Sequence, residues 1–176
     1  MIAWVVGWVF GPTLMWLAAM VLSGLYFIMS VIDIKAYILP DRLTYGSAIL
    51  ALPASIWIFN NDPVNVLWGG LIGAGLFWAV GIFYMKYRGV EGLGLGDVKL
   101  MLSVGFLSTA ELLPLTMIVA GMAALAAFGV LSVSGKVNTA LLERRLPFGP
   151  CLCLAGWIAL LFGDGMWQWW LDFILR

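Results

Sequence analysis

Hydrophobic residues dominate this chain in six long runs that are separated by short polar connections. The runs cover residues 13–32, 44–60, 64–85, 98–109, 112–134 and 148–163. A helix that crosses a bilayer needs about 20 mainly apolar residues. The pattern therefore predicts an all-α membrane protein, a polytopic bundle of about six transmembrane helices. The fourth run is short, which suits a tilted or half-buried helix.

The two ends of the chain are also apolar. Residues 1–11 either extend the first run or lie along the membrane surface, and residues 165–176 have the composition of an interfacial tail. No internal repeat, low-complexity linker or second domain is visible between them. We therefore predict that residues 1–176 form a single transmembrane domain.

The basic residues indicate how the bundle is oriented. They gather in three of the connections, as follows: Lys35, Arg42, Lys86, Arg88, Lys99, Lys136, Arg144 and Arg145. Connections rich in Lys and Arg stay in the cytoplasm. Both termini are then expected on the non-cytoplasmic side. Five tryptophans near the termini fit an aromatic belt at that interface: Trp4, Trp8, Trp167, Trp169 and Trp170.

The composition excludes several classes of function. The chain is 64% hydrophobic and 10% charged, whereas a soluble domain carries about 25% charged residues. Nine basic and nine acidic residues cancel, so nothing indicates a nucleic-acid partner, and the lipid bilayer is the expected surrounding. Histidine is absent, which excludes Ser-His and Cys-His nucleophiles and histidine-based metal sites. No cofactor or metal is expected.

The two cysteines, Cys151 and Cys153, lie in the last apolar run. Two thiols alone cannot supply a structural zinc site. Residues two apart on a helix do not face each other, so a disulfide between them is not expected. Both are interpreted as small apolar residues of a membrane helix.

Two acidic residues border apolar runs at positions that suggest chemistry. Asp33 ends the first run and Asp97 begins the fourth. The two runs between them cross the membrane out and back, so both carboxylates return to the cytoplasmic face. A carboxylate at a membrane edge is costly and marks a candidate functional site.

A carboxylate pair can activate water for hydrolysis. Two nearby carboxylates do not both ionise easily, so they titrate as a unit. The ionised member can take a proton from water, and the protonated member can donate to a peptide carbonyl oxygen. Asp33 and Asp97 are therefore the candidate catalytic residues.

Glycines precede the second acid. Gly92, Gly94 and Gly96 can adopt positive φ and admit a second backbone closely, so this segment could bind an extended peptide. A flexible entry to the helix, with Asp97 as its N-cap, is an equally good interpretation. Lys99 follows, and is expected to tune Asp97 or to stabilise its loop.

Asp41 is a third acid near the same face. It follows Pro40, which biases Leu39 to an extended conformation, and it precedes the second run. N-capping of that helix explains Asp41 better than direct chemistry does.

The motifs resemble those of the type IV prepilin peptidases, bacterial members of the Gly-x-Gly-Asp membrane aspartyl proteases. The similarity covers Asp33 with the segment 39–44, then Gly94-Leu-Gly-Asp-Val-Lys-Leu100, then Leu146-Pro-Phe-Gly-Pro150. It extends from about residue 30 to residue 163. All three elements occur in order.

The resemblance implies an activity. Such enzymes cleave the short basic leader from type IV prepilins or pseudopilins at the cytoplasmic face of the bacterial inner membrane, without a metal or a covalent intermediate. The family's two catalytic aspartates map onto Asp33 and Asp97, and Asp41 matches a position that is not the usual catalytic acid. The substrate-binding or supporting residues are then Gly94, Gly96, Lys99, Pro40 and Asp41.

One departure from the family pattern concerns methylation. Longer members carry a cytoplasmic domain with paired Cys-x-x-Cys motifs and also N-methylate the new terminus. In this sequence Cys-x-x-Cys does not occur. The resemblance is therefore to a short, peptidase-only form without a zinc or methyltransferase domain, and methyltransferase activity is not expected.

Two other functions compete with proteolysis. A small proton- or cation-coupled transporter would also use membrane acids, but it should carry polar residues at mid-membrane along its pathway. A structural assembly subunit gives no reason for two acids at helix ends. Proteolysis is favoured over both.

Overall fold

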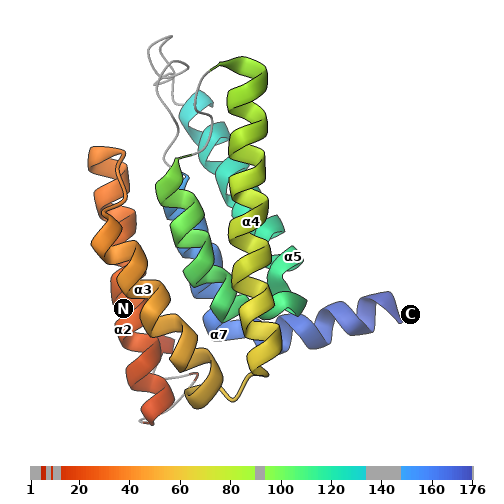
Figure 1. The fold of residues 1–176 in the computed structure, drawn as a ribbon. Coiled ribbons are helices and arrows are strands. Elements are labelled where there is room, and N and C mark those ends of the chain that lie inside the picture. Colours follow the sequence, from red (N-terminus) through yellow and green to blue (C-terminus); the bar gives the residue numbers. More distant parts are fainter. Residues whose placement is uncertain (1–4, 7–8, 10–12, 90–93, 134–147, 176) are drawn as a thin grey trace.

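The computed structural model describes residues 5–6, 9, 13–89, 94–133 and 148–175. Throughout these ranges the regular structure is helical and no strand occurs, which confirms the predicted all-α class. The elements are α2 (Leu14–Ala36), α3 (Asp41–Pro53), the π-helix η1 (Ala54–Ile58), α4 (Pro63–Arg88), α5 (Leu95–Val133) and α7 (Gly149–Ile174). Figure 1 shows them side by side as a bundle, with the last part of α7 leaving it at one end.

Local sequence explains where α2 and α4 begin and end. The side chains of Thr13 and Asp62 accept hydrogen bonds from backbone N–H groups of the first turns of α2 and α4, as N-cap residues do. Left-handed residues, Tyr37 and Gly89, end the same two helices.

α5 is two helices joined at Thr109. This residue has φ 56° and ψ 173°, which no helix accommodates, and it is the last residue of the predicted run 98–109. The Thr116 hydroxyl donates to Ser108 Oγ across the break, at 3.0 Å. Figure 1 shows the first arm of α5 running toward one end of the bundle and the second arm returning.

Several helices are long and apolar enough to cross a membrane. By length and composition these are Leu14–Ala36, Pro63–Tyr87 and Leu95–Val130, and a fourth is obtained if Gly149–Gly163 and Gly165–Asp172, bent by 81°, form one span. As one straight helix, the third would be about 54 Å long, well beyond a hydrocarbon core of about 30 Å, so its break at Thr109 divides it. The chain is a multi-pass membrane protein, while the count of six spans and the side of the termini stay predictions.

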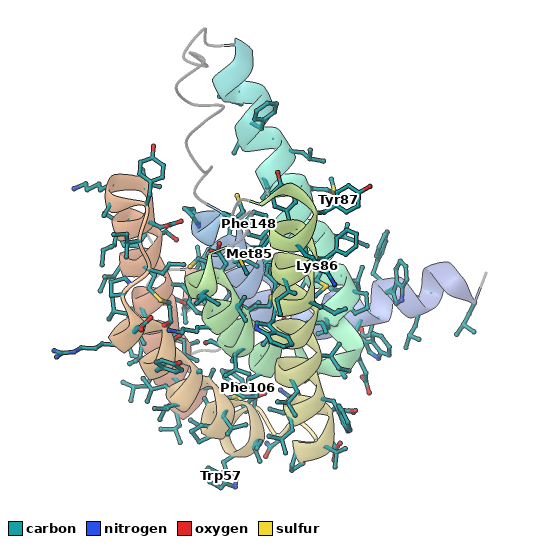
Figure 2. All side chains as sticks on the ribbon, turned by 45° about the horizontal axis from the view of Figure 1, so that its top comes forward. Trp57, Met85, Lys86, Tyr87, Phe106 and Phe148 are labelled. Carbon is teal, nitrogen blue, oxygen red and sulfur yellow. The ribbon has the colours of Figure 1, made fainter. Side chains whose placement is uncertain are left out.

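Large apolar side chains cover the outside of the bundle. Trp57 at the end of η1 is 77% exposed and Tyr87 near the end of α4 is 82% exposed. Figure 2 shows Trp57 pointing away from the bundle, among many other apolar side chains on the outer surface. A soluble protein rarely exposes so much contiguous apolar surface, whereas lipid tails solvate it.

Glycines allow the first arm of α5 to touch α4. A Cβ on Gly105 would lie 2.4 Å from the carbonyl oxygen of Gly69 and 2.8 Å from Cα of Gly70. Small residues of this kind let membrane helices approach closely. The contact fixes the arm that carries Asp97.

We expect Gly105→Ala to destabilise the protein by about 2 kcal/mol or more, because the new methyl group meets backbone that cannot turn aside. Thermal unfolding in detergent measures the change. Gly75→Ala is the matched control, since nothing lies within 4 Å of a Cβ there. Equal melting temperatures for the two variants would contradict this packing.

Candidate active site

The two acids predicted from the sequence lie at the same end of the bundle. Asp33 is in the last turn of α2 and Asp97 is in the first turn of α5. Figure 1 shows that α2 ends at the level where α3, α5 and α7 begin. Both acids are buried, with exposed fractions of 5% and 9%, and they are close enough to interact electrostatically.

The beginning of α7 supplies a hydrogen bond to the first acid. The backbone N–H of Gly149 donates to Asp33 Oδ2 at 3.1 Å. A helix N-terminus carries partial positive charge and favours an anion. A Cβ on Gly149 would lie 2.6 Å from the same oxygen, so glycine is required for the carboxylate to come this close. Sequence analysis placed Gly149 only in the shared motif at 146–150 and did not identify its contact with Asp33.

Leu39 packs against the starts of α5 and α7, next to both acids. It is 8% exposed. A Cβ on Gly96 would lie 2.9 Å from Leu39 Cβ, and a Cβ on Gly149 would lie 3.2 Å from Leu39 Cδ1. Pro40 stands next to it at the N-cap of α3, with φ −64° and ψ 127°. The 37–40 connection therefore places an apolar side chain against the first residues of both α5 and α7.

The glycines before Asp97 serve that packing. Gly94 O accepts the backbone N–H of Asp97 at 3.0 Å and so starts α5. Asp97 lies inside the helix, so its interpretation as the N-cap is wrong. Gly96 does not have a positive φ, so the expected left-handed conformation is not the reason for glycine at this position. Glycine is needed because Leu39 occupies the space that a side chain would fill. Gly92 lies outside the described residues.

Asp41 and Lys99 pair with each other. Lys99 Nζ lies 2.7 Å from Asp41 Oδ1 and 5.0 Å from the centre of the Tyr45 ring. Asp41 is the first residue of α3, and its N-cap is Pro40, so the predicted capping role of Asp41 is wrong. Proline at the cap leaves the Asp41 carboxylate free for a cation on the neighbouring helix. Lys99 joins α5 to α3.

We expect Asp41→Asn to lower the rate of the peptide cleavage that the sequence resemblance implies by less than about 10-fold, because ion pairs between exposed groups contribute little. The Asp41 side chain is 66% exposed. The effect of the substitution should shrink further at high salt, which screens the pair in the unmodified protein. A loss as large as that of a buried acid would give Asp41 a direct part in the reaction.

The thiols of α7 lie near the acids. Cys151 and Cys153 are free and buried, as expected. Cys153 interacts electrostatically with both Asp33 and Asp97. Its neighbourhood is more polar than the apolar sequence around it suggested.

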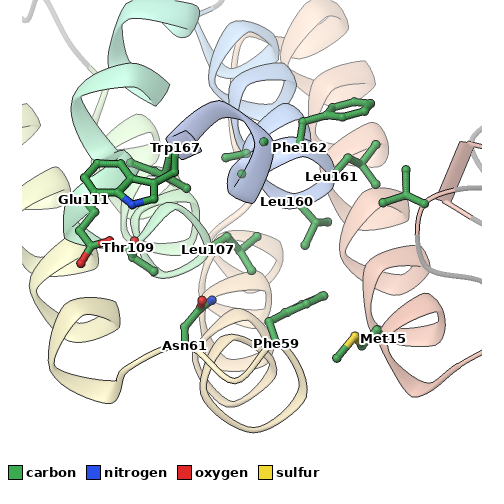
Figure 3. Close-up of a pocket in the computed structure, with 15 residues that line it drawn as sticks. Met15, Phe59, Asn61, Leu107, Thr109, Glu111, Leu160, Leu161, Phe162 and Trp167 are labelled. Atoms are coloured by element: carbon green, nitrogen blue, oxygen red, sulfur yellow. The ribbon is translucent and has the colours of Figure 1, made fainter. Parts of the chain in front are cut away.

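A cavity of about 520 Å³ lies elsewhere, beside the break in α5. Figure 3 shows Thr109, Glu111 and Trp167 on one side of it and Asn61 and Phe59 on another. Neither Asp33 nor Asp97 lines this cavity. Glu111 is the carboxylate among the described side chains that line it, and both candidate acids lie elsewhere, so we place the candidate site at the acid pair.

The known proteins that this chain resembles carry peptidase names, which agrees with the geometry of the acid pair. A model described as the type IV leader peptidase family matches residues 20–130. The chain is 33% identical over 168 residues to a prepilin leader peptidase/N-methyltransferase of Pseudomonas aeruginosa. That alignment covers 96% of this chain and 57% of the relative. Proteins of the same name from Stutzerimonas stutzeri and Burkholderia pseudomallei are 32% identical over 159 residues and 34% identical over 155 residues. Those two alignments cover 90% and 88% of this chain, and 54% and 49% of the relatives.

The chain thus spans about half the length of the curated relatives it matches. No solved structure matches it.

Proposed function

Because the chain belongs to the type IV leader peptidase family, we propose that it is an aspartic endopeptidase that removes the leader from type IV prepilins or pseudopilins. The observation that carries the proposal is the burial of Asp33 and Asp97 together, from helices far apart in sequence. Among the described residues neither acid has a cationic partner within ion-pair distance. Burial of an unpaired acid is costly, and function explains why both are present.

The mechanism follows from a coupled carboxylate pair. One member is ionised and takes a proton from a water molecule held between the two. The other is protonated and donates to the carbonyl oxygen of the scissile peptide bond, which lets the water oxygen attack the carbonyl carbon. The carboxyl that took the proton from water then gives it to the amide nitrogen, and the tetrahedral intermediate collapses with loss of the C–N bond and return of a proton to the second carboxylate. The Gly149 N–H holds Asp33 in place throughout.

We place the reaction at the cytoplasmic face of the inner membrane. Lys35, Arg42 and Lys99 all lie at the end of the bundle that carries the acids, and basic residues favour the cytoplasmic side. A leader that protrudes into the cytoplasm reaches the pair from that side.

A cleavage assay tests the proposal. The full chain is purified in detergent and incubated with a prepilin whose leader is followed by its apolar segment, and the products are identified by mass spectrometry. We expect one cut, at the junction of leader and apolar segment. Intact prepilin after long incubation with folded enzyme, across several pilin classes, would overturn the proposed function. The N-methyltransferase activity in the relatives' name is not part of the proposal.

A further inference from the structure

A stripe of polar side chains follows one face of α2 into the membrane. Ser23, Tyr26, Ser30 and Asp33 are spaced by three, four and three residues, so they lie on the same side of the helix. Ser23 and Tyr26 are each only 2% exposed. A polar group buried in an apolar protein core is costly unless it is hydrogen-bonded.

Each member of the stripe has a partner. Ser23 Oγ accepts from Trp157 Nε1 of α7 at 2.9 Å. Ser30 Oγ donates to the Tyr26 carbonyl oxygen at 2.8 Å. The Tyr26 hydroxyl shares a hydrogen bond of 3.0 Å with Ser103 Oγ of α5. This bond between Tyr26 and Ser103 joins the two helices that carry the acids.

Tyr26 reaches from α2 to α5 beside Gly156 of α7, between two helices that do not pack closely on each other. α2 packs against α3 and α7 but hardly touches α5, whereas α5 packs against α3, α4 and α7. The spacing between α2 and α5 is therefore not fixed by direct contact of their backbones. A fully buried tyrosine, bonded at its far end to Ser103, is long enough to set it.

The bond lies at matching depth below both acids. Asp33 follows Tyr26 by seven residues on α2, and Asp97 precedes Ser103 by six on α5. At 1.5 Å per residue these separations are about 10 Å and about 9 Å along helices that run in opposite directions. A change in the spacing at Tyr26 therefore passes to the acids through two turns of each helix.

We propose that Tyr26 and Ser103 are positioning residues of the peptidase, which set the separation between Asp33 and Asp97 through their hydrogen bond. The inference rests on the proposed function. Neither residue touches the peptide, and both act through the two helices.

The test compares Tyr26→Phe and Ser103→Ala with the unmodified enzyme in the prepilin assay. Misplacing catalytic groups by about 1 Å costs about 10²-fold in rate. We expect each variant to lower kcat by about 10-fold to 10²-fold with KM unchanged, and the double variant to be no slower than the worse single one. Ser103→Thr keeps a hydroxyl and should restore most of the rate.

The pH dependence of kcat separates positioning from simple stability. Two coupled carboxylates give two inflections in the plot of kcat against pH, and weaker electrostatic coupling between them brings the two inflections closer together. We therefore expect the pH range between the inflections to be narrower in Tyr26→Phe than in the unmodified enzyme. The other titratable side chains near the acids, which are the buried thiols Cys151 and Cys153 and the pair Lys99–Asp41, are present in every variant.

Ser23→Ala is the matched control, because it removes a buried interhelical hydrogen bond that does not reach α5. It should cost stability while leaving the pH profile unchanged. If Tyr26→Phe or Ser103→Ala, as folded protein, keeps the kcat and pH profile of the unmodified enzyme, the positioning role is wrong. If the unmodified enzyme itself does not cleave, the proposed function fails instead. Should Tyr26→Phe not fold, Ser103→Ala carries the same comparison.

Discussion

Replacing either buried acid, as Asp33→Asn or Asp97→Asn, is expected to lower prepilin cleavage by about 10³-fold or more. The amide keeps the size of the carboxylate but can neither take a proton from water nor stand as the protonated donor, and acid–base catalysis contributes about 10² to 10⁴-fold to a rate. The rate is measured with purified variants in detergent, and their folding is checked by thermal unfolding. Both variants should remain folded, since removal of a buried charge relieves a cost.

Asp172→Asn is the control for this comparison. Asp172 is exposed in the last part of α7, away from the acid pair, and its loss should leave the rate within about two-fold of the unmodified enzyme, as surface substitutions usually do. Normal cleavage by Asp97→Asn would remove that residue from the mechanism, even if Asp33→Asn were inactive.

The second large effect is expected from Gly149→Ala. The added methyl group would lie 2.6 Å from Asp33 Oδ2 and 3.2 Å from Leu39 Cδ1. The carboxylate must move away, and its hydrogen bond from the Gly149 N–H lengthens or breaks. We expect a loss of about 10²-fold in kcat, because both acids are needed in one geometry.

Gly121→Ala provides the comparison for a glycine in a helix. Nothing lies within 4 Å of a Cβ at that position, and alanine is the better helix former, so both rate and stability should be preserved. Full activity of Gly149→Ala would mean that Asp33 does not act from its position beside the start of α7.

Much of this architecture could be predicted from the order of apolar runs. The run that ends at Asp33 and the run that begins at Asp97 define the acid ends of α2 and α5, because chain crossings alone decide which ends share a face. The break at Thr109 falls where the predicted run 98–109 ends, for the same reason. These features depend on sequence composition, which is visible locally.

The partners of the acids could not be predicted in this way. The Gly149 N–H that binds Asp33 comes from a residue 116 positions later, and only tertiary packing brings it there. The cap of α3 was misassigned because Asp41 is a good N-cap residue by type, whereas Pro40 takes the cap and a lysine on another helix attracts the carboxylate. The polar stripe on α2 was not predicted, although its residues have helical spacing, and nothing in the sequence identifies Ser103 as the partner of Tyr26.

The break at Thr109 has a consequence for solvent. The arm 95–108 is about 21 Å long at 1.5 Å per residue, shorter than a hydrocarbon core of about 30 Å. If Asp97 sits at the cytoplasmic headgroup layer, as proposed, the turn at Thr109 lies several ångströms short of the opposite layer. The backbone groups that the turn leaves open then need partners below the headgroups, and the cavity of about 520 Å³ lined by Asn61, Thr109 and Glu111 is large enough to hold water for them.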